Sequence, residues 1–310
     1  MKFIKPKFWD KKNSFLSLIL LPISIFFEFL IFIKKKCVKE VKFNLHVICV
    51  GNIYVGGTGK TPLSVFIAKE LNSNGKKTAI VRKFYKNHVD EHKFIKEKFK
   101  DLILKNERAH AISSAKKVGY DSVILDDGFQ DYKIKKNLNI ICFNQSQKIG
   151  NGFVLPSGPL RENLSALKNV QIVVINGKKD PAFEQKILEI NKNIDIFYSY
   201  YSPVGIDKFK NKKILALAGI GNPENFFSLL TSNNLKLEKK MVFPDHYSFT
   251  KSEIVKILNY AESNNLKLVM TEKDYFKIKH FDLKAIEFLE VALILEEKEK
   301  FIRRIINSYD

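Results

Sequence analysis

The chain has 310 residues, which is long enough for two α/β domains that each bury a core of their own. Its 53 Lys and Arg residues against 33 Asp and Glu residues give a net charge of +20. This excess suits nucleic acid, an anionic membrane or a phosphorylated substrate, and composition does not choose among them. Cys37, Cys49 and Cys142 show neither metal nor disulfide spacing, which argues against a disulfide framework and favours a reducing compartment.

The first feature along the chain is an apolar stretch over residues 14–33, with lysines before and after it. It is long enough to span a bilayer, and Lys34-Lys35-Lys36-Cys37 offers no small-residue cleavage site. On a helix, its polar residues fall within a sector of roughly 100°. They are Asn13, Ser14, Ser17, Ser24 and Glu28. This stripe favours a helix that lies in the membrane interface or packs the stripe on its own protein, with lysines meeting lipid phosphates. A spanning helix and a buried soluble helix stay open.

Residues 46–71 combine an apolar strand, a glycine loop over 51–59 and a helix that opens with Lys60 and Thr61. In this arrangement backbone N–H groups and the helix N-terminus face a phosphate, the lysine reaches the outer phosphates and the threonine ligates Mg²⁺. The predicted nucleotide-phosphate site consists of Tyr54, Val55, Gly56, Gly57, Thr58, Gly59, Lys60 and Thr61. The loop is a Walker variant, because Tyr54 stands where the first glycine belongs. A glycine turn that binds nothing is the alternative.

Short apolar runs alternate with polar or helical segments along the rest of the chain. They are residues 77–82, 122–126, 139–143, 170–176, 214–218, 266–271 and 291–295, with a helix over 226–230. This alternation predicts an α/β fold with a mainly parallel sheet. We expect an N-terminal membrane-associated helix over residues 1–40, a P-loop kinase-like nucleotide-binding domain over 41–204 and a second, smaller α/β domain over 205–310. The boundary is set where the apolar pattern lapses around Pro203 and Gly205.

Two groups of charged residues follow predicted strands. Asp126 and Asp127 end an apolar strand, which would place an acid beside the Mg²⁺ of a P-loop site, although a capped turn is the alternative. Arg161 and Glu162 close a loop that is rich in glycine and proline. Arg161 can clamp a phosphate and Glu162 can help to hold a metal, and an ordinary surface turn with a solvated ion pair fits this loop as well.

A histidine stands beside a carboxylate in the segment Phe243-Pro244-Asp245-His246-Tyr247. The pair suggests proton transfer, and a structural role in its loop is the alternative. A catalytic role requires a partner from the first domain. Asp90 is the candidate for that partner.

Several short motifs are distributed over most of the chain. They are Val50-Gly51-Asn52 with residues 55–62, Asp126-Asp127-Gly128-Phe129-Gln130, Asn151-Gly152 with residues 155–162, Ala218-Gly219-Ile220-Gly221-Asn222-Pro223-Glu224, Phe243-Pro244-Asp245-His246 and Thr271-Glu272-Lys273-Asp274. Together they resemble the tetraacyldisaccharide 4′-kinase family of lipid A synthesis, which also lacks the first Walker glycine. The chain departs from the family at residues 81–85, where the family usually has Ser-Arg-Gly-Tyr, and at Asp131, where the family has histidine.

The resemblance implies ATP-dependent phosphorylation of the 4′-hydroxyl of a membrane-embedded, tetraacylated glucosamine disaccharide 1-phosphate. It implies an N-terminal membrane helix, and a place at the cytoplasmic face of the inner membrane of a Gram-negative bacterium. By position, Lys60 and Thr61 would bind ATP and Mg²⁺, Asp126 and Asp127 would lie at the metal, and Asp90 with His246 would activate the hydroxyl. Glu162 is a further candidate metal ligand, and Arg82 and Arg161 are the candidate substrate-binding residues.

Two other classes of protein fit part of the sequence. A membrane-associated P-loop ATPase that positions partners often has a signature lysine where this chain has Val55, which counts against that class. A nucleic-acid-binding protein would explain the charge but not the apolar helix. We therefore expect the acylated disaccharide lipid and an anionic membrane surface as partners, and no nucleic acid.

Overall fold

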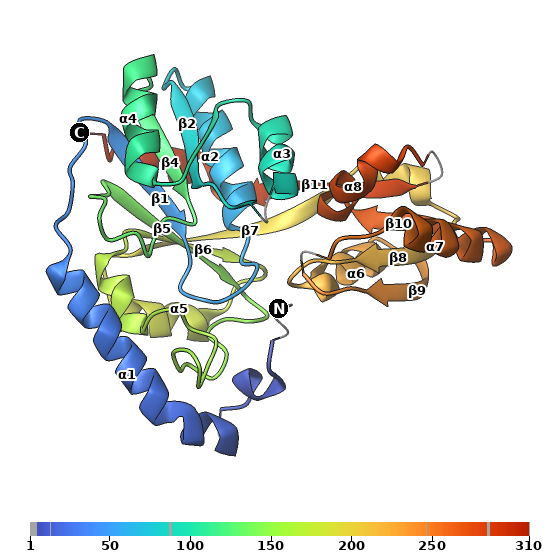
Figure 1. Cartoon of the computed structure of the whole chain (residues 1–310), viewed down its shortest axis with the longest axis horizontal. Helices are drawn as coiled ribbons and strands as arrows, with labels where there is room; N and C mark the ends of the chain where they lie inside the picture. The colour runs from blue at the N-terminus through green and yellow to red at the C-terminus, as the bar shows by residue number, and fades with distance from the viewer. Residues whose placement is uncertain (1–4, 13, 87–88, 246, 284–285, 310) are drawn as a thin grey trace. The chain divides into compact units, whose positions relative to one another are not determined.

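The computed structural model describes residues 5–12, 14–86, 89–245, 247–283 and 286–309, and contacts divide the chain into two compact α/β units (Figure 1). The larger unit holds Lys5–Val89, Ile95–Tyr200 and the chain from Leu295 onward. The smaller unit holds Asp90–Phe94 and Tyr201–Ile294. The chain leaves the larger unit along β7 (Asp195–Val204) and returns along β11 (Glu287–Leu295).

The end of the chain groups with the larger unit, whereas the sequence analysis assigned it to the smaller domain. The reason lies in helix α9 (Lys298–Ile306), which buries Phe301, Ile302 and Ile305. The ring of Phe301 packs edge-on against Phe197 of the larger unit, with the centroids 5.1 Å apart. Burial of these apolar side chains fixes the C-terminal segment there.

The sheet of the larger unit is parallel in every strand pair, with the order β3-β2-β4-β1-β5-β6-β7. Its strands are β1 (His46–Gly51), β2 (Thr78–Lys83), β3 (Leu102–Lys105), β4 (Ser122–Asp126), β5 (Leu138–Asn144), β6 (Ile172–Asn176) and β7. Val50 pairs with Asp126, and Val81 with Leu125. The carboxyl ends of β1, β2 and β4 therefore meet at one edge, and this edge brings the loops that follow them together.

Helices α2 (Lys60–Ser73), α4 (Arg108–Val118), α5 (Pro181–Leu188) and the 3₁₀ turn η3 (Leu164–Asn169) complete the larger unit. Leu63, Ile67 and Leu71 on one face of α2 are buried, as their spacing predicts. Helix α3 (Val89–Lys98) is divided between the two units. Cys37, Cys49 and Cys142 are free thiols.

The smaller unit is a parallel sheet in the order β11-β10-β8-β9, with apolar cores on both faces. It contains β8 (Lys213–Ala218), β9 (Lys236–Val242), β10 (Lys267–Thr271), α6 (Pro223–Ser232), α7 (Lys251–Ser263), α8 (Glu272–Ile278), η4 (Ile206–Phe209) and η5 (Lys279–Phe281). Ile214 and Ala216 of β8 pack in the core that contains α6, and Leu215 and Leu217 pack in the core that contains α7. This alternation fixes the register of β8 between two helical layers.

Helix α1 (Phe15–Cys37) packs on the larger unit through polar side chains, preceded by the turn η1 (Lys7–Asp10). The Ser24 hydroxyl donates to the Val154 carbonyl at 2.9 Å and accepts from the Ser157 amide at 3.0 Å. Asn151 Nδ2 donates to the Ser17 hydroxyl at 3.0 Å, and Asn163 Nδ2 donates to Glu28 at 3.3 Å. The polar stripe thus packs on the protein itself, which is one of the two arrangements that the sequence favoured. Its first member, Asn13, lies outside the described residues.

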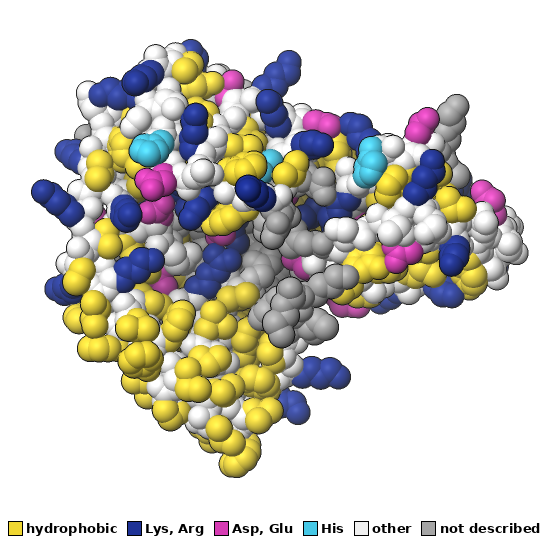
Figure 2. Space-filling view, viewed as in Figure 1, with side chains coloured by type: hydrophobic (Ala, Val, Ile, Leu, Met, Phe, Trp, Pro, Cys, Tyr) yellow, Lys and Arg dark blue, Asp and Glu magenta, His cyan; other side chains and the backbone are white. Residues whose placement is uncertain are grey.

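The remaining face of α1 is apolar and exposed, and it forms a yellow band along the lower edge of Figure 2. Phe15, Phe26 and Phe29 are 74%, 61% and 56% exposed. Within the part of the chain that the structure describes, α1 is the one helix long and apolar enough to cross a membrane, with a mean hydropathy of 2.6. A helix with polar contacts inward and apolar side chains outward is suited to a lipid surface.

Candidate active site

The loop between β1 and α2 shapes the N-terminus of α2 for an anion. Gly59 caps the helix with φ at +90°, a left-handed conformation that glycine adopts without strain. Asn52 Nδ2 donates to the Thr58 hydroxyl at 3.0 Å and to the Gly56 carbonyl at 3.3 Å, which holds the loop in place. Because the capping residue has no side chain, the first N–H groups of α2 are left for a ligand.

Tyr54, which replaces the first Walker glycine, has its side chain in the core. It is 1% exposed and belongs to the same buried cluster as Val154 and Leu160. The next residue, Val55, donates its N–H to the Pro159 carbonyl at 2.8 Å. The loop over residues 150–162 therefore contacts the loop between β1 and α2 beside Tyr54. Compared with a glycine at this position, Tyr54 gives the backbone less conformational freedom. A ligand can meet Tyr54 only through its backbone.

Asp126, at the end of β4, is buried and faces the first turns of α2. Its Oδ2 accepts from the Thr61 hydroxyl and from Arg82 Nη1, each at 2.9 Å, and its Oδ1 accepts from the Ser64 hydroxyl at 3.2 Å. The structure thus brings Thr61 and Asp126 together. Arg82, which the sequence analysis assigned to the substrate, is 9% exposed and pairs with Asp126.

Asp127 follows in a left-handed conformation with φ at 53° and lies among cations. Its Oδ1 is 2.9 Å from Arg161 Nη1 and 3.5 Å from Lys60 Nζ. Burial acts to raise the pKa of Asp127, but Lys60, Arg161, Arg108 and Arg82 together hold this pKa below its usual value. Burial lowers the pKa of Lys60, and Asp127 opposes that shift. Asp127 is therefore a carboxylate whose single charge offsets part of the charge of Lys60 and Arg161.

Arg108 of α4 holds the turn that carries both aspartates. Its Nη2 donates to the Asp127 carbonyl at 2.7 Å and to the Asp126 carbonyl at 3.4 Å. Its Nη1 lies 3.5 Å from Asp131 Oδ2. Asp131, where the family has histidine, therefore pairs with an arginine that fixes the turn after β4.

Glu162 is 2% exposed and lies one residue beyond Arg161. Its Oε1 accepts from Gln130 Nε2 at 3.0 Å, and its Oε2 is 2.6 Å from Lys35 Nζ of α1. Gln130 Oε1 in turn accepts from Arg161 Nη1 at 3.4 Å. The structure thus places Glu162 in a chain of contacts between α1 and the aspartates.

The predicted metal ligands are Thr61, Asp126, Asp127 and Glu162. Across the described ranges, no group of three or more His, Cys, Asp and Glu side chains could hold a metal ion. Mg²⁺ differs from Zn²⁺ in that it keeps several waters and phosphate oxygens, so it needs only one or two carboxylates and a hydroxyl. The oxygens of Thr61 and Asp126, 2.9 Å apart beside the phosphate loop, fit this requirement.

The structure describes little of the predicted proton-transfer pair. His246 lies outside the described residues, and of Asp90 only its backbone position in α3 is described. Their neighbours are brought together by Lys273, whose Nζ lies 3.7 Å from Glu91 Oε1 and 3.5 Å from Asp245 Oδ1. One ammonium therefore bridges α3 and the loop after β9.

Asp274, in the last of the sequence motifs, is fully buried and structural. Its Oδ2 accepts from the Gly219 amide and from the Thr271 hydroxyl, both at 2.7 Å, and its Oδ1 is 2.6 Å from Lys277 Nζ. These contacts tie the turn after β8 to the start of α8. Asp274 of the motif Thr271-Glu272-Lys273-Asp274 thus stabilises the fold of the smaller unit.

Sequence reasoning missed four contributors to this site. Ser64 was findable, because it lies one helical turn after Thr61 on the same face. Gln130 stood in a quoted motif but received no role. Arg108 and Lys35 reach the site from distant helices, and no local pattern marks them.

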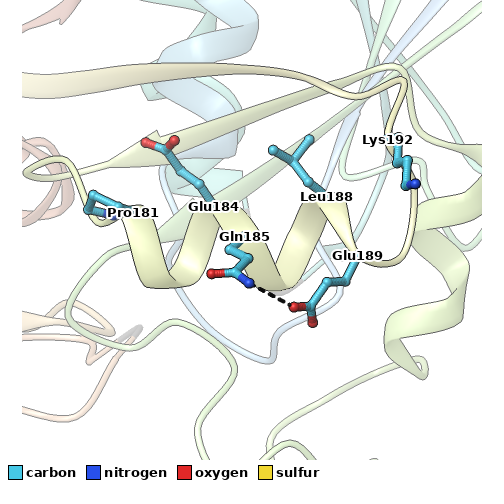
Figure 3. A pocket seen from close by; sticks show the side chains of 6 residues that line it. All are labelled: Pro181, Glu184, Gln185, Leu188, Glu189 and Lys192. Atoms are coloured by element: carbon cyan, nitrogen blue, oxygen red, sulfur yellow. Dashed lines mark hydrogen bonds between the residues drawn. The ribbon is translucent and has the colours of Figure 1, made fainter.

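A shallow pocket lies elsewhere, along α5 (Figure 3). It is lined by Pro181, Glu184, Gln185, Leu188, Glu189 and Lys192, and Gln185 Nε2 donates to Glu189 Oε1 at 3.2 Å. None of these residues belongs to the phosphate loop or to the aspartate turn. The pocket is therefore separate from the candidate site.

The family model described as "Tetraacyldisaccharide-1-P 4'-kinase" matches residues 16–309. The chain belongs to this family. A tetraacyldisaccharide 4'-kinase of Pelagibacter ubique is 39% identical over 311 residues, covering 99% of this chain and 98% of that protein. One of Rickettsia bellii is 32% identical over 294 residues, covering 90% of each.

A solved structure of another tetraacyldisaccharide 4'-kinase shares the fold. It is described as the "apo" form of LpxK from Aquifex aeolicus in complex with ATP, and it superimposes with a TM-score of 0.73 at 24% identity. The match covers 95% of this chain and 100% of that one. The predicted α/β fold and the resemblance drawn from the motifs are both confirmed, and the partner-positioning ATPase is not favoured.

Proposed function

We propose that this member of the family transfers the γ-phosphate of ATP to the 4′-hydroxyl of a tetraacylated glucosamine disaccharide 1-phosphate. One geometric observation carries the nucleotide half of the proposal: the Thr61 hydroxyl meets Asp126 at 2.9 Å at the start of a helix whose glycine cap leaves its N–H groups for phosphate. Family membership supports the acceptor half.

In this proposal, residues 54–60 hold the phosphates of ATP through backbone N–H groups and the Lys60 ammonium. Thr61 and Asp126 would hold Mg²⁺ with Asp127 beside them, and Mg²⁺ bound there would supply charge neutralisation at the transferring phosphate. Arg82, Ser64 and Arg108 would keep the two carboxylates in place. Their fixed geometry lets the site stabilise charge without reorganising during the reaction.

Arg161 would contact the transferring phosphate. Its side chain is 29% exposed, and its guanidinium contacts Asp127 and Gln130, so the group is oriented yet accessible. When an anion enters, Arg161 and Lys60 would exchange part of their contact with Asp127 for contact with phosphate oxygens. Glu162 would not contact the phosphate. It would help to orient Arg161 through Gln130.

Asp90 and His246 would activate the acceptor hydroxyl. A sugar hydroxyl is a poor nucleophile until its proton has an acceptor, and a carboxylate supported by an imidazole supplies one. The ion pairs of Lys273 support this pairing. Glu91 adjoins Asp90 and Asp245 adjoins His246 in the sequence, and both carboxylates contact the Lys273 ammonium.

We propose that α1 lies in the membrane interface. Ser17, Ser24 and Glu28 bind the protein along roughly 16 Å of the helix, so lipid cannot surround that length on all sides. The exposed phenylalanines would enter the lipid, on the cytoplasmic face of the inner membrane where ATP is present. The net charge of +20 would then attract the protein to an anionic membrane surface, and not to nucleic acid.

The test is incubation of the purified protein with γ-labelled ATP, Mg²⁺ and the acylated disaccharide 1-phosphate in detergent micelles. The proposal expects label in the lipid fraction, dependent on the acceptor. Label that appears only as inorganic phosphate would instead identify an ATPase and overturn the proposal.

A further inference from the structure

The membrane helix contributes a charged side chain to the candidate site. Lys35, in the last turn of α1, places its ammonium 2.6 Å from Glu162 Oε2. The Glu162 side chain is 2% exposed, whereas that of Lys35 is 37% exposed. A carboxylate this buried needs a counter-charge, because its desolvation is costly when it is unpaired.

From Glu162 the contacts run without a break to the aspartates. Gln130 Nε2 donates to Glu162 Oε1 and to the Asn52 carbonyl, both at 3.0 Å. Gln130 Oε1 accepts from Arg161 Nη1 at 3.4 Å, and the same nitrogen donates to Asp127 Oδ1 at 2.9 Å. Lys35 is therefore connected to Asp127 through three intervening side chains, those of Glu162, Gln130 and Arg161.

The position of Lys35 is set by the rest of α1. Ser24 fixes the middle of the helix to Ser157, at 2.8 Å between the hydroxyls, in the same loop that ends at Glu162. The Lys35 ammonium also lies 5.0 Å from the ring centroid of Tyr132, which adds a cation–π contact. The lysine is thus held on both sides and is not a freely solvated charge.

We propose that Lys35 is a positioning residue for phosphoryl transfer, so that the site is complete only when the membrane helix is docked. This inference rests on the proposed kinase function. Lys35 neutralises Glu162 and keeps it from competing with Asp127 for Arg161. Without Lys35, the Glu162 carboxylate draws Gln130 and Arg161 toward itself, and the guanidinium leaves the position where it meets the transferring phosphate. A displacement of about 1 Å at such a group is enough to cost up to roughly 10²-fold in rate.

The experiment compares Lys35→Met with Lys39→Met in the full chain, in micelles with ATP and the acylated disaccharide. Each substitution removes one positive charge from the same exposed stretch of chain, and Met keeps an unbranched side chain of similar length. We expect Lys35→Met to lower kcat about tenfold with the KM for ATP within about twofold, and Lys39→Met to leave both unchanged. Lys35→Arg restores most of kcat, because it returns the charge.

A double-mutant cycle separates positioning from folding. In the background of Glu162→Gln, the Lys35→Met substitution should cost less than about twofold, since the buried charge that needs Lys35 is gone. Equal kcat for Lys35→Met and Lys39→Met overturns the inference, as does a tenfold loss that persists in the Glu162→Gln background. If the wild-type protein itself transfers no label to lipid, the proposed function fails instead.

Discussion

Asp126 and Asp127 are adjacent in sequence but have different surroundings. Asp126 is fully buried and accepts from Thr61, Ser64 and Arg82. Asp127 stands in a left-handed turn between Lys60 and Arg161, and these cations hold its pKa below the usual value against the effect of burial. The first is suited to hold a metal-ligating hydroxyl, and the second to release part of its contact with Lys60 and Arg161 to an incoming phosphate.

Loss of the Lys60 ammonium should lower the rate of phosphoryl transfer strongly. Lys60→Ala removes the fixed counter-charge from the transferring phosphoryl group, so we expect kcat to fall by about 10²-fold or more. Lys69→Ala, on an exposed face of the same helix, is the control and should retain full activity. Steady-state kinetics check both variants. A Lys60→Ala enzyme within a few-fold of wild type contradicts the assignment of the phosphate loop.

Asp90 and His246 are expected to act as a unit. Each single change to Ala should lower kcat by about 10²–10⁴-fold with little change in the KM for ATP, because a positioned base is lost. The double variant should lose much less than the product of the single losses. Losses that multiply strictly, or normal kcat for His246→Ala, would leave His246 as a structural residue of its loop.

At the scale of elements, α1 combines an inward polar stripe with an outward apolar face. Replacing Phe15, Phe26 and Phe29 by Ser removes three exposed rings without touching the hydrogen bonds of Ser17 and Ser24. At about 1 kcal/mol for each partly inserted ring, partitioning into anionic vesicles should fall by about 10²-fold. Vesicle cosedimentation measures this.

Val118→Ser is the control for that experiment, because Val118 is an equally exposed apolar residue of α4, at 61%. Its substitution should leave the bound fraction unchanged. Unchanged cosedimentation of the triple variant would mean that the membrane contact lies elsewhere in the chain.

The elements that the sequence predicted well are those with a buried, uninterrupted apolar run or a motif. The phosphate loop and the strands β1, β4 and β5 are of this kind. Three strands were missed. In β9, exposed and half-buried residues alternate and lysines are frequent, so apolar residues adjoin only at its end, at Met241 and Val242. Strand β3 is a short edge strand of four half-buried or exposed residues.

Strand β7 was missed because Pro203 and Gly205 indicated a lapse of the apolar pattern around residues 200–210. The strand runs through Pro203 to Val204 before Gly205 turns the chain at φ of 62°. The division of the chain by contacts falls between Tyr200 and Tyr201, within this strand. At the site, Thr61 and Asp126 were both expected beside Mg²⁺, Thr61 from the phosphate-loop motif and Asp126 as an acid at the end of an apolar strand. The pairing of Glu162 with Lys35 was not, since 127 residues separate them and neither belongs to a local pattern that points to the other.

At the scale of the whole molecule, His46 links pH to the stability of the larger unit. Its ring stacks on Tyr309 at 4.0 Å and its Nε2 lies 3.1 Å from the Ser308 hydroxyl. Burial, with a smaller contribution from Lys76, lowers the pKa of His46 from 6.5 to about 4. The unfolded chain therefore binds one more proton than the folded chain between these values, and stability falls as the pH falls from 6.5 to about 4.

The loss attributable to His46 is at most about 3 kcal/mol over that window. His46→Gln cannot take up the proton, so its unfolding temperature should depend less on pH than that of wild type. Calorimetry from pH 7.5 to pH 5 measures the two slopes. Identical slopes would show that His46 does not contribute to the acid sensitivity.

The most direct test of the central claim is to locate the phosphate on the product. After reaction of the wild-type protein with ATP and the acylated disaccharide 1-phosphate, phosphorus–proton correlation NMR of the purified lipid identifies the esterified carbon. The account predicts a new phosphorus signal correlated with the proton on C4′, beside the original one at C1, and neither product nor signal with Lys60→Ala. A phosphate on any other hydroxyl, or an unmodified lipid with release of inorganic phosphate, would contradict it.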